Sequence, residues 1–232
     1  MISRIPNTRS WFGTSARAAS PTANAVTTPY LVDLIIQAEQ DGYDAVVSHC
    51  FGSPGIPEGR ELVNIPVVGA GEAAFYVAMM CGDRLGVITV GGTYRTPSHG
   101  AMMHLVRKMV REYAITDRVV SIRTTGLCVE DCADEEVLFD SLLREAEKSI
   151  DDGAEVIILG CTGMINTAEK LQAKLEAPVV DPSVAALKFA ELLISMNLTH
   201  SKLTLPSPDM IGVKCEMKWP PTMGRWPRGG KE

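Results

Sequence analysis

The segment DGYDAVVSHCFG, residues 41–52, returns in altered form as DGAEVIILGCTG, residues 152–163. In both copies a glycine is followed by a short apolar run, and the run leads to a cysteine and a second glycine. Equivalent residues lie 111 positions apart, so Cys50 corresponds to Cys161. A short apolar run bounded by glycines predicts a buried strand. Repetition at a fixed offset predicts that two parts of the chain adopt similar folds.

The similarity extends beyond the two cysteines. The stretch IPVVGAGEAA, residues 65–74, aligns with APVVDPSVAA, residues 177–186, once the offset changes to 112. Apolar residues at helical spacing precede each cysteine strand, and these two helices are expected to end at Gly42 and Gly153. For each half the sequence therefore predicts the order helix, strand, cysteine, loop or helix, strand, helix. Strands are expected at residues 44–48, 66–69, 85–90, 118–123, 155–160 and 178–180, and a further helix at about 98–114.

Apolar strands that alternate with helices indicate an α/β fold, in which parallel sheets are covered by helices on both faces. The repeat predicts two pseudo-symmetric lobes, each a mostly parallel sheet flanked by helices. We assign residues 1–90 and 181–200 to the first lobe, residues 91–180 to the second, and residues 201–232 to an irregular, proline-rich C-terminal tail. The segment 11–29 is expected to be a loop.

Composition limits the classes of function. The chain has 232 residues, 46% of them hydrophobic, and a formal net charge of −6 without a basic stripe, so nucleic acid is not expected as a partner. Its apolar stretches fall short of the roughly 20 residues of a membrane span, and its first residues lack the hydrophobic centre of a secretion signal. We therefore expect a cytoplasmic protein with free thiols. Cys128 and Cys132 have no companion pair of Cys or His at zinc-site spacing, so no metal site is expected.

Both repeated cysteines follow a strand, and ligands of parallel sheets bind beyond the carboxyl ends of the strands. Two lobes that face each other would place Cys50 and Cys161 on opposite sides of a shared cleft. One thiolate could remove a proton from a carbon beside a carbonyl group, and the opposite thiol could return a proton to the other face, which inverts that carbon. The same geometry also admits a single-thiol isomerase or decarboxylase. A redox pair would require sulfurs close enough to bond.

With these residues in view, the chain resembles the aspartate/glutamate/hydantoin racemase superfamily from about Tyr30 to His200. The sequence CFGSPG, residues 50–55, is similar to the first-cysteine motif Cys-Phe-Gly-Asp-Pro-Gly of the hydantoin and allantoin racemase branch. The sequence GAEVIILGCTGM, residues 153–164, is similar to its second-cysteine segment. The resemblance implies a cofactor-independent isomerase.

The resemblance also implies the residues of the site. Cys50 and Cys161 would be the acid/base residues, and a small-molecule substrate would lie in the cleft between the lobes. The substrate-binding residues would be Asn7, Phe51, Gly52, Ser53, Thr162 and Gly163. We expect the protein to be a homo-oligomer.

The favoured substrate is a cyclic amide such as a 5-substituted hydantoin or allantoin. Amino-acid racemases of the superfamily typically have Cys-Asn-Thr and Cys-Thr-Glu where this chain has Cys-Phe-Gly and Cys-Thr-Gly. Maleate isomerases keep both cysteines and stay an alternative, whereas arylmalonate decarboxylases keep only the second, so Cys50 counts against that activity. Cys50 lies only 43 positions after Asn7, a shorter distance than in relatives, which leaves a catalytically weakened ligand-binding protein as an alternative of another class.

His49 precedes Cys50 and suggests a Cys–His dyad. Neighbouring residues of a strand point to opposite faces, which makes a direct hydrogen bond between these two side chains awkward. We therefore assign no catalytic role to His49 from the sequence.

Overall fold

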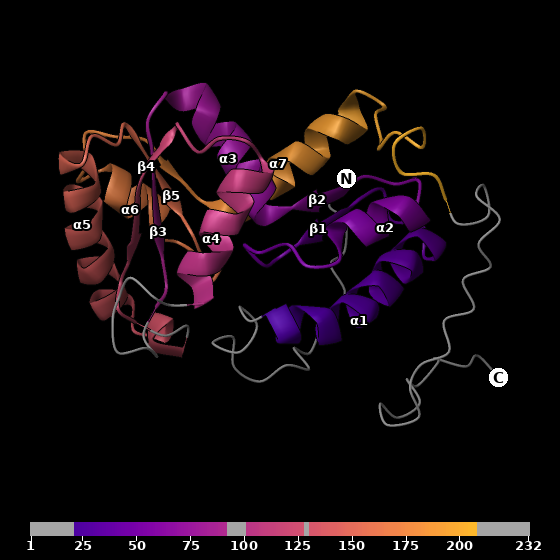
Figure 1. Ribbon diagram of the computed structural model, residues 1–232, viewed down its shortest axis with the longest axis horizontal. Coiled ribbons are helices and arrows are strands. Elements are labelled where there is room, and N and C mark those ends of the chain that lie inside the picture. Colours follow the sequence, from indigo (N-terminus) through magenta and orange to yellow (C-terminus); the bar gives the residue numbers. More distant parts are fainter. Residues whose placement is uncertain (1–20, 92–100, 128–129, 208–232) are drawn as a thin grey trace.

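The computed structural model describes residues 21–91, 101–127 and 130–207 (Figure 1). Within these residues the strands form two parallel sheets, one with the order β1-β2 and one with the order β4-β3-β5-β6. The strands are β1 Val46–Ser48, β2 Val67–Gly69, β3 Leu85–Thr89, β4 Val119–Thr124, β5 Val156–Leu159 and β6 Val179–Val180. The helices are α1 Pro21–Gln40, α2 Ile56–Leu62, α3 Ala70–Cys81, α4 Ala101–Glu112, α5 Glu135–Asp151, α6 Ala168–Gln172 and α7 Pro182–Ser195, with a short 3-10 turn at Glu130–Ala133. The predicted α/β class is confirmed.

The repeat in the sequence is a repeat in the structure. The order α1-β1-α2-β2-α3 recurs as α5-β5-α6-β6-α7. The register is the same in both copies, because Val46 pairs with Val67 as Ile157 pairs with Val179. Gly42 and Gly153 both end the preceding helix with positive φ, 80° and 93°, a conformation that glycine adopts without a steric penalty.

Helix α1 begins earlier than the sequence predicts. The expected loop over 11–29 is wrong for its last nine residues, because α1 already starts at Pro21 and continues through Pro29. Threonines and an internal proline are poor helix formers, so this stretch of sequence predicts a loop. In the structure, the hydroxyls of Thr27 and Thr28 both donate to the Asn24 carbonyl. Tertiary packing of the later turns against α2 and β2 then fixes the helix.

Strand β3 joins the larger sheet. The predicted boundary at residue 90 leaves Leu85–Thr89 in the first lobe, whereas its backbone pairs with β4 on one side and β5 on the other. The apolar run that identifies a strand does not indicate which other strands it pairs with. The sheet pairing therefore places this strand with the residues of the second lobe.

The helices that follow β2 and β6 connect the two sheets. Helices α3 and α7 occupy equivalent positions in the repeat and pack against each other, with the rings of Tyr76 and Phe189 6.1 Å apart. Helix α7 also contacts β1 and β2, and α3 also contacts β5 (Figure 1). Helix α7 of the second half therefore packs on strands of the first, and α3 of the first half packs on a strand of the second, which ties the two cysteine-bearing sheets together.

The segment after α7 returns to the smaller sheet. The ammonium group of Lys202 donates to the carbonyls of Arg60, Glu61 and Val63 at the end of α2, at 2.8–2.9 Å. The N–H of Val67 in β2 donates to Nε2 of His200 at 2.9 Å. These bonds satisfy carbonyls and an edge N–H that the secondary structure leaves open.

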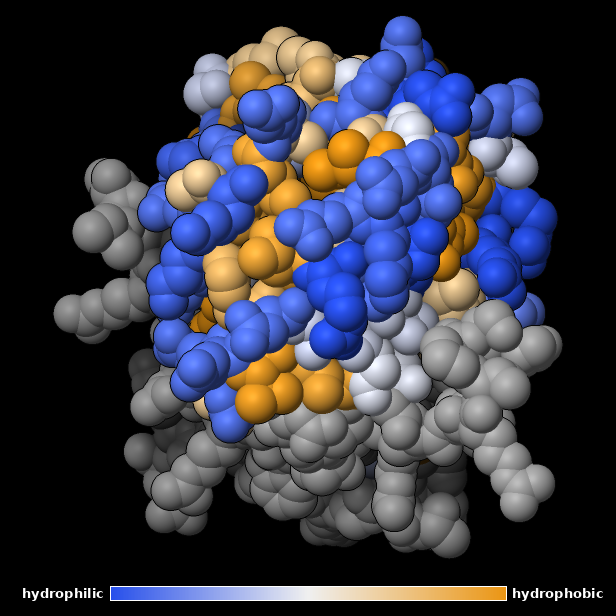
Figure 2. Space-filling view, turned by 90° about the vertical axis from the view of Figure 1, so that its left-hand side faces the viewer, coloured by the Kyte–Doolittle hydropathy of each residue, from blue (hydrophilic) through white to orange (hydrophobic). Residues whose placement is uncertain are grey.

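The opposite end of the molecule is covered by α5. Its buried apolar residues, Leu138, Leu142 and Ala146, recur every four positions and pack in the core of the larger sheet. Asp134 caps the helix by accepting from the N–H of Val137 at 3.2 Å. Figure 2 shows this end from outside, where hydrophilic side chains predominate among scattered hydrophobic ones. Among the described residues, no helix has the length and apolar character needed to cross a membrane.

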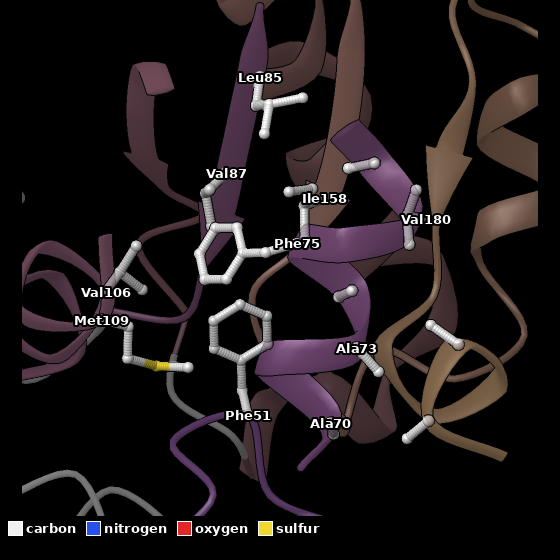
Figure 3. Packing of buried hydrophobic residues seen from close by; sticks show 14 of the residues in the cluster. Phe51, Ala70, Ala73, Phe75, Leu85, Val87, Val106, Met109, Ile158 and Val180 are labelled. Atoms are coloured by element: carbon white, nitrogen blue, oxygen red, sulfur yellow. The ribbon is translucent and has the colours of Figure 1, made fainter. Parts of the chain in front are cut away.

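The main core lies where α3 meets the Cys50 turn. The ring of Phe51 is 2% exposed and packs edge-on against Phe75 of α3, with centroids 5.8 Å apart and an interplanar angle of 70°. Figure 3 shows the two rings next to each other, beside Val106 and Met109 of α4. The cysteine turn is thus anchored by an aromatic side chain that occupies the core.

Replacing Gly71 with alanine tests how tightly α3 packs on this turn. A Cβ atom at Gly71 would overlap the backbone carbonyl of Phe51 and would lie 2.5 Å from Cε of Met109. Although alanine favours a helix, the overlap with backbone cannot be relieved by rotating a side chain. We expect Gly71→Ala to lower the free energy of unfolding by about 1–3 kcal/mol, measured by urea denaturation.

The matched control is Met80→Ala in the same helix, since Met80 is 87% exposed. This variant should change the free energy of unfolding by less than about 0.5 kcal/mol. Equal stability of Gly71→Ala and the unmodified protein would contradict the close packing described here.

Candidate active site

The two repeated cysteines occupy equivalent places beyond two strands. Cys50 lies two residues after the end of β1, and Cys161 lies two residues after the end of β5. Both begin the same turn, because the N–H of Ser53 donates to the Cys50 carbonyl at 3.0 Å and the N–H of Met164 donates to the Cys161 carbonyl at 3.2 Å. The sequence repeat therefore reproduces the local geometry of the thiol as well as its position.

Backbone N–H groups approach both sulfur atoms. The N–H of Gly163 donates to Sγ of Cys161 at 3.4 Å. The N–H groups of Gly52 and Ser53 interact in the same way with the thiol of Cys50. Donors aimed at sulfur stabilise the thiolate relative to the neutral thiol.

Burial has the opposite effect on the pKa of the two thiols. Desolvation is the largest influence on both thiols and raises the pKa of Cys50 and of Cys161 above the ordinary thiol value, while the backbone N–H groups partly oppose it. A charge on Cys50 also raises the pKa of Cys161, so the two thiols interact electrostatically. Two acids that interact in this way lose their protons in separate steps. The interaction consequently disfavours the state in which both thiols are ionised at once.

A hydrogen bond joins the two cysteine turns directly. The hydroxyl of Thr162, the residue after Cys161, donates to the carbonyl of His49, the residue before Cys50, at 3.2 Å. The structure thus brings the ends of β1 and β5 together, although these strands belong to different sheets.

The sequence-predicted binding residues divide into three groups. Gly52, Ser53, Thr162 and Gly163 lie in the two cysteine turns and gather there with both thiols. The prediction that Phe51 lines the substrate site is not met for its side chain, because the ring lies in the core. The sequence motif places a residue beside the cysteine but does not say on which side of the turn its ring lies. Asn7 lies outside the described residues.

The Cys50 turn is constrained on both sides. A Cβ atom at Gly52 would lie 2.6 Å from Cδ2 of Leu105 in α4, so the turn passes close to that helix. Ser53 has φ of 48°, in the left-handed region, and its hydroxyl donates to the carbonyls of Cys50 and Phe51 at 3.3 Å each. Such a conformation is strained for a residue other than glycine and persists because its surroundings hold it.

Two residues at the site are not assigned by the sequence. Nε2 of His49 and Oγ of Ser183 lie 3.1 Å apart and form a hydrogen bond. Ser183 stands in the first turn of α7, which follows β6. The alignment of residues 65–74 with 177–186 could have indicated Ser183 as a site residue, since it places Ser183 just beyond the end of a second strand. The described residues include no cluster of three or more His, Cys, Asp or Glu side chains arranged to hold a metal ion.

Comparison with known proteins shows the family. Residues 12–190 match the profile described as Asp/Glu/hydantoin racemase. The chain is 36% identical over 177 residues to the hydantoin racemase of Pseudomonas sp. (strain NS671), an alignment that covers 75% of this chain and 68% of that protein. It is 33% identical over 181 residues to the hydantoin racemase of Paenarthrobacter aurescens, covering 77% and 73% respectively.

A solved structure gives the same result. The allantoin racemase from Pseudomonas fluorescens superposes with a TM-score of 0.73 and 30% identity, covering 81% of this chain and 77% of that one. The chain belongs to the Asp/Glu/hydantoin racemase family of isomerases.

Proposed function

We propose that the protein is a cofactor-independent racemase of a cyclic amide, a 5-substituted hydantoin or allantoin, in which Cys50 and Cys161 exchange protons with one carbon. The observation that carries this proposal is the placement of both thiols in matching turns that touch through the Thr162–His49 hydrogen bond. The names of the similar proteins, hydantoin racemase and allantoin racemase, support the choice of substrate.

The chemistry needs only the two sulfur atoms and the backbone. The C5–H bond of a hydantoin is acidified by the neighbouring carbonyl. The thiolate removes this proton and becomes a thiol, and the electron pair moves to the carbonyl oxygen. The opposite thiol then donates its proton to the other face of C5 and becomes a thiolate. General acid–base groups of this kind contribute about 10²–10⁴-fold each.

The protonation states of the two thiols suit this order of proton transfers. Two-base transfer requires one sulfur to be ionised while the other keeps its proton. Burial and the interaction between Cys50 and Cys161 disfavour double ionisation, and the N–H groups of the two turns stabilise a single thiolate. Reversal of the reaction only exchanges the roles of the two residues.

The turns also favour an uncharged substrate. The residues that follow the two cysteines are Phe51, Gly52, Thr162 and Gly163, none of which carries a charge. A free amino acid would need charged partners for its carboxylate and ammonium groups. An amino-acid racemase or a maleate-type isomerase is therefore the second candidate. A catalytically weakened binding protein is the alternative of another class, and binding of a hydantoin without turnover would favour it.

The expected homo-oligomer stays a prediction.

Substitution of either cysteine tests whether each thiol exchanges protons with one face of the substrate carbon. We expect Cys50→Ser and Cys161→Ser each to abolish racemisation of a single-enantiomer hydantoin, followed as loss of optical rotation, because a serine hydroxyl is far too weak an acid to replace the thiol. In D₂O each variant should still exchange the C5 proton of one enantiomer, and the two variants should prefer opposite enantiomers. The exchange is measured by proton NMR.

The control is Cys81→Ser, because Cys81 is exposed at the end of α3 and has no part in the proposed reaction. Its rate should match that of the unmodified protein. Exchange of both enantiomers at equal rates in either active-site variant would refute the two-base scheme.

The pH dependence follows from the direction of the pKa shifts. Burial raises the pKa of both thiols, so at neutral pH both are largely protonated and the base is scarce. Raising the pH produces the first thiolate, and kcat/KM should therefore increase past the ordinary thiol pKa of about 8.5. It should fall only when the second thiol ionises. A profile of kcat/KM that is flat between about pH 7 and about pH 9 would contradict raised thiol pKa values.

A further inference from the structure

At the position of His49 the two halves of the repeat differ in chemistry. The offset of 111 that pairs Cys50 with Cys161 pairs His49 with Gly160. Gly160 has no room for a side chain, because a Cβ atom there would lie 2.8 Å from Cβ of Thr89 and 3.0 Å from the Ile88 carbonyl oxygen. His49 is exposed instead. One cysteine turn therefore has a bonding side chain that the other cannot have.

Two hydrogen bonds of His49 reach the second half of the chain. Its carbonyl accepts the hydroxyl of Thr162 at 3.2 Å, and its Nε2 bonds to Oγ of Ser183 at 3.1 Å. Covalent bonds connect His49 to Cys50 and Thr162 to Cys161. The path from one cysteine to the other thus crosses a single hydrogen bond, and the Ser183 contact provides a second attachment for the same residue.

Ser183 is a firm anchor for the ring. Its N–H donates to Oδ1 of Asp181 at 2.7 Å, and the N–H of Val184 donates to the same oxygen at 3.3 Å. These bonds cap α7, the helix that packs against α3 and the smaller sheet. The carboxylate of Asp181 occupies the N–H groups of the helix start, so this start is not a free anion site.

Hydrogen bonds of this kind matter because no strand pairing joins the two sheets within the described residues. The separation between the two thiols is then set by helix packing and by the bonds between the turns. Proton transfer in two directions requires both sulfurs to stay within about 3–3.5 Å of one carbon, and small displacements lower the rate strongly.

We propose that His49 is a positioning residue, which holds the Cys50 turn against Thr162 and Ser183 and thereby fixes the spacing between the thiols of Cys50 and Cys161. The inference rests on the proposed function for its effect on catalysis. Its effect on the spacing of the thiols does not depend on that function.

The catalytic test uses a double-mutant cycle. His49→Ala and Ser183→Ala should each lower kcat for hydantoin racemisation about 2- to 10-fold, the value of one hydrogen bond, with KM nearly unchanged. The double variant should be no slower than either single variant, because both remove the same bond. His49→Gln should recover most of the activity, since its amide can bond to the Ser183 hydroxyl.

The matched control is Ser195→Ala. Ser195 lies at the other end of α7, and its hydroxyl donates to the carbonyl of Leu192 in its own helix at 2.8 Å. This variant should keep the kcat of the unmodified protein. Additive losses in the double variant, or no recovery in His49→Gln, would overturn the proposal.

A second measurement does not require activity. Dibromobimane becomes fluorescent when it bridges two neighbouring thiols, and Cys50→Ser gives the background from other cysteines. The rate of bridging should fall in His49→Ala and recover in His49→Gln, while the melting temperature shows that each variant is folded. An unchanged bridging rate in His49→Ala would refute the positioning role. If bridging changes as expected but no hydantoin or allantoin is racemised even by the unmodified protein, the proposed function fails and the positioning role stands.

Discussion

Contact between the two cysteine turns is the constraint on which the site depends. Cys50 and Cys161 belong to different sheets, and each is useful for two-base chemistry only if the other is near. The hydrogen bond from Thr162 to the His49 carbonyl joins the turns, and the packing of α3 on α7 holds the sheets that carry them. The Cys50 turn is held in place because Gly71 of α3 lies close to its backbone and because the ring of Phe51 packs in the core. A duplicated fold thus produces one composite site.

The electrostatics of the site result from two opposing effects. Burial favours the neutral thiol, and a shift of one pKa unit corresponds to about 1.4 kcal/mol. The backbone N–H groups of Gly52, Ser53 and Gly163 stabilise a thiolate without introducing a positive side chain. A cationic partner would favour ionisation of one particular thiol. Backbone donors in matching turns leave both thiols able to act as base, which is what a reversible inversion requires.

Much of the fold could be predicted from the repeat alone. Glycine, apolar run and cysteine recur with a constant offset, and the structure reproduces the strands, the helix ends and the turns around Cys50 and Cys161. The start of α1 could not be predicted, because Pro29 and the two threonines before it are poor helix formers. In the structure the threonine hydroxyls bond to the carbonyl of Asn24 within the helix. The sheet to which β3 belongs is also hidden, since pairing is a long-range property.

The site shows the same division. Thiol positions follow from the ends of strands, whereas the direction of a side chain in a turn does not. The motif suggests Phe51 as a substrate contact, but its ring is buried in the core. Ser183 is distant in the sequence from His49, and only the packing of α7 beside β1 brings them together.

The most direct measurement of the central claim is the first turnover of the unmodified protein in D₂O with a single-enantiomer hydantoin. Two sulfurs on opposite faces predict that newly formed product contains deuterium at C5 while unreacted substrate still contains protium. Early appearance of deuterium in the remaining substrate at the same rate as in the product would mean that one group serves both faces, and would contradict the account.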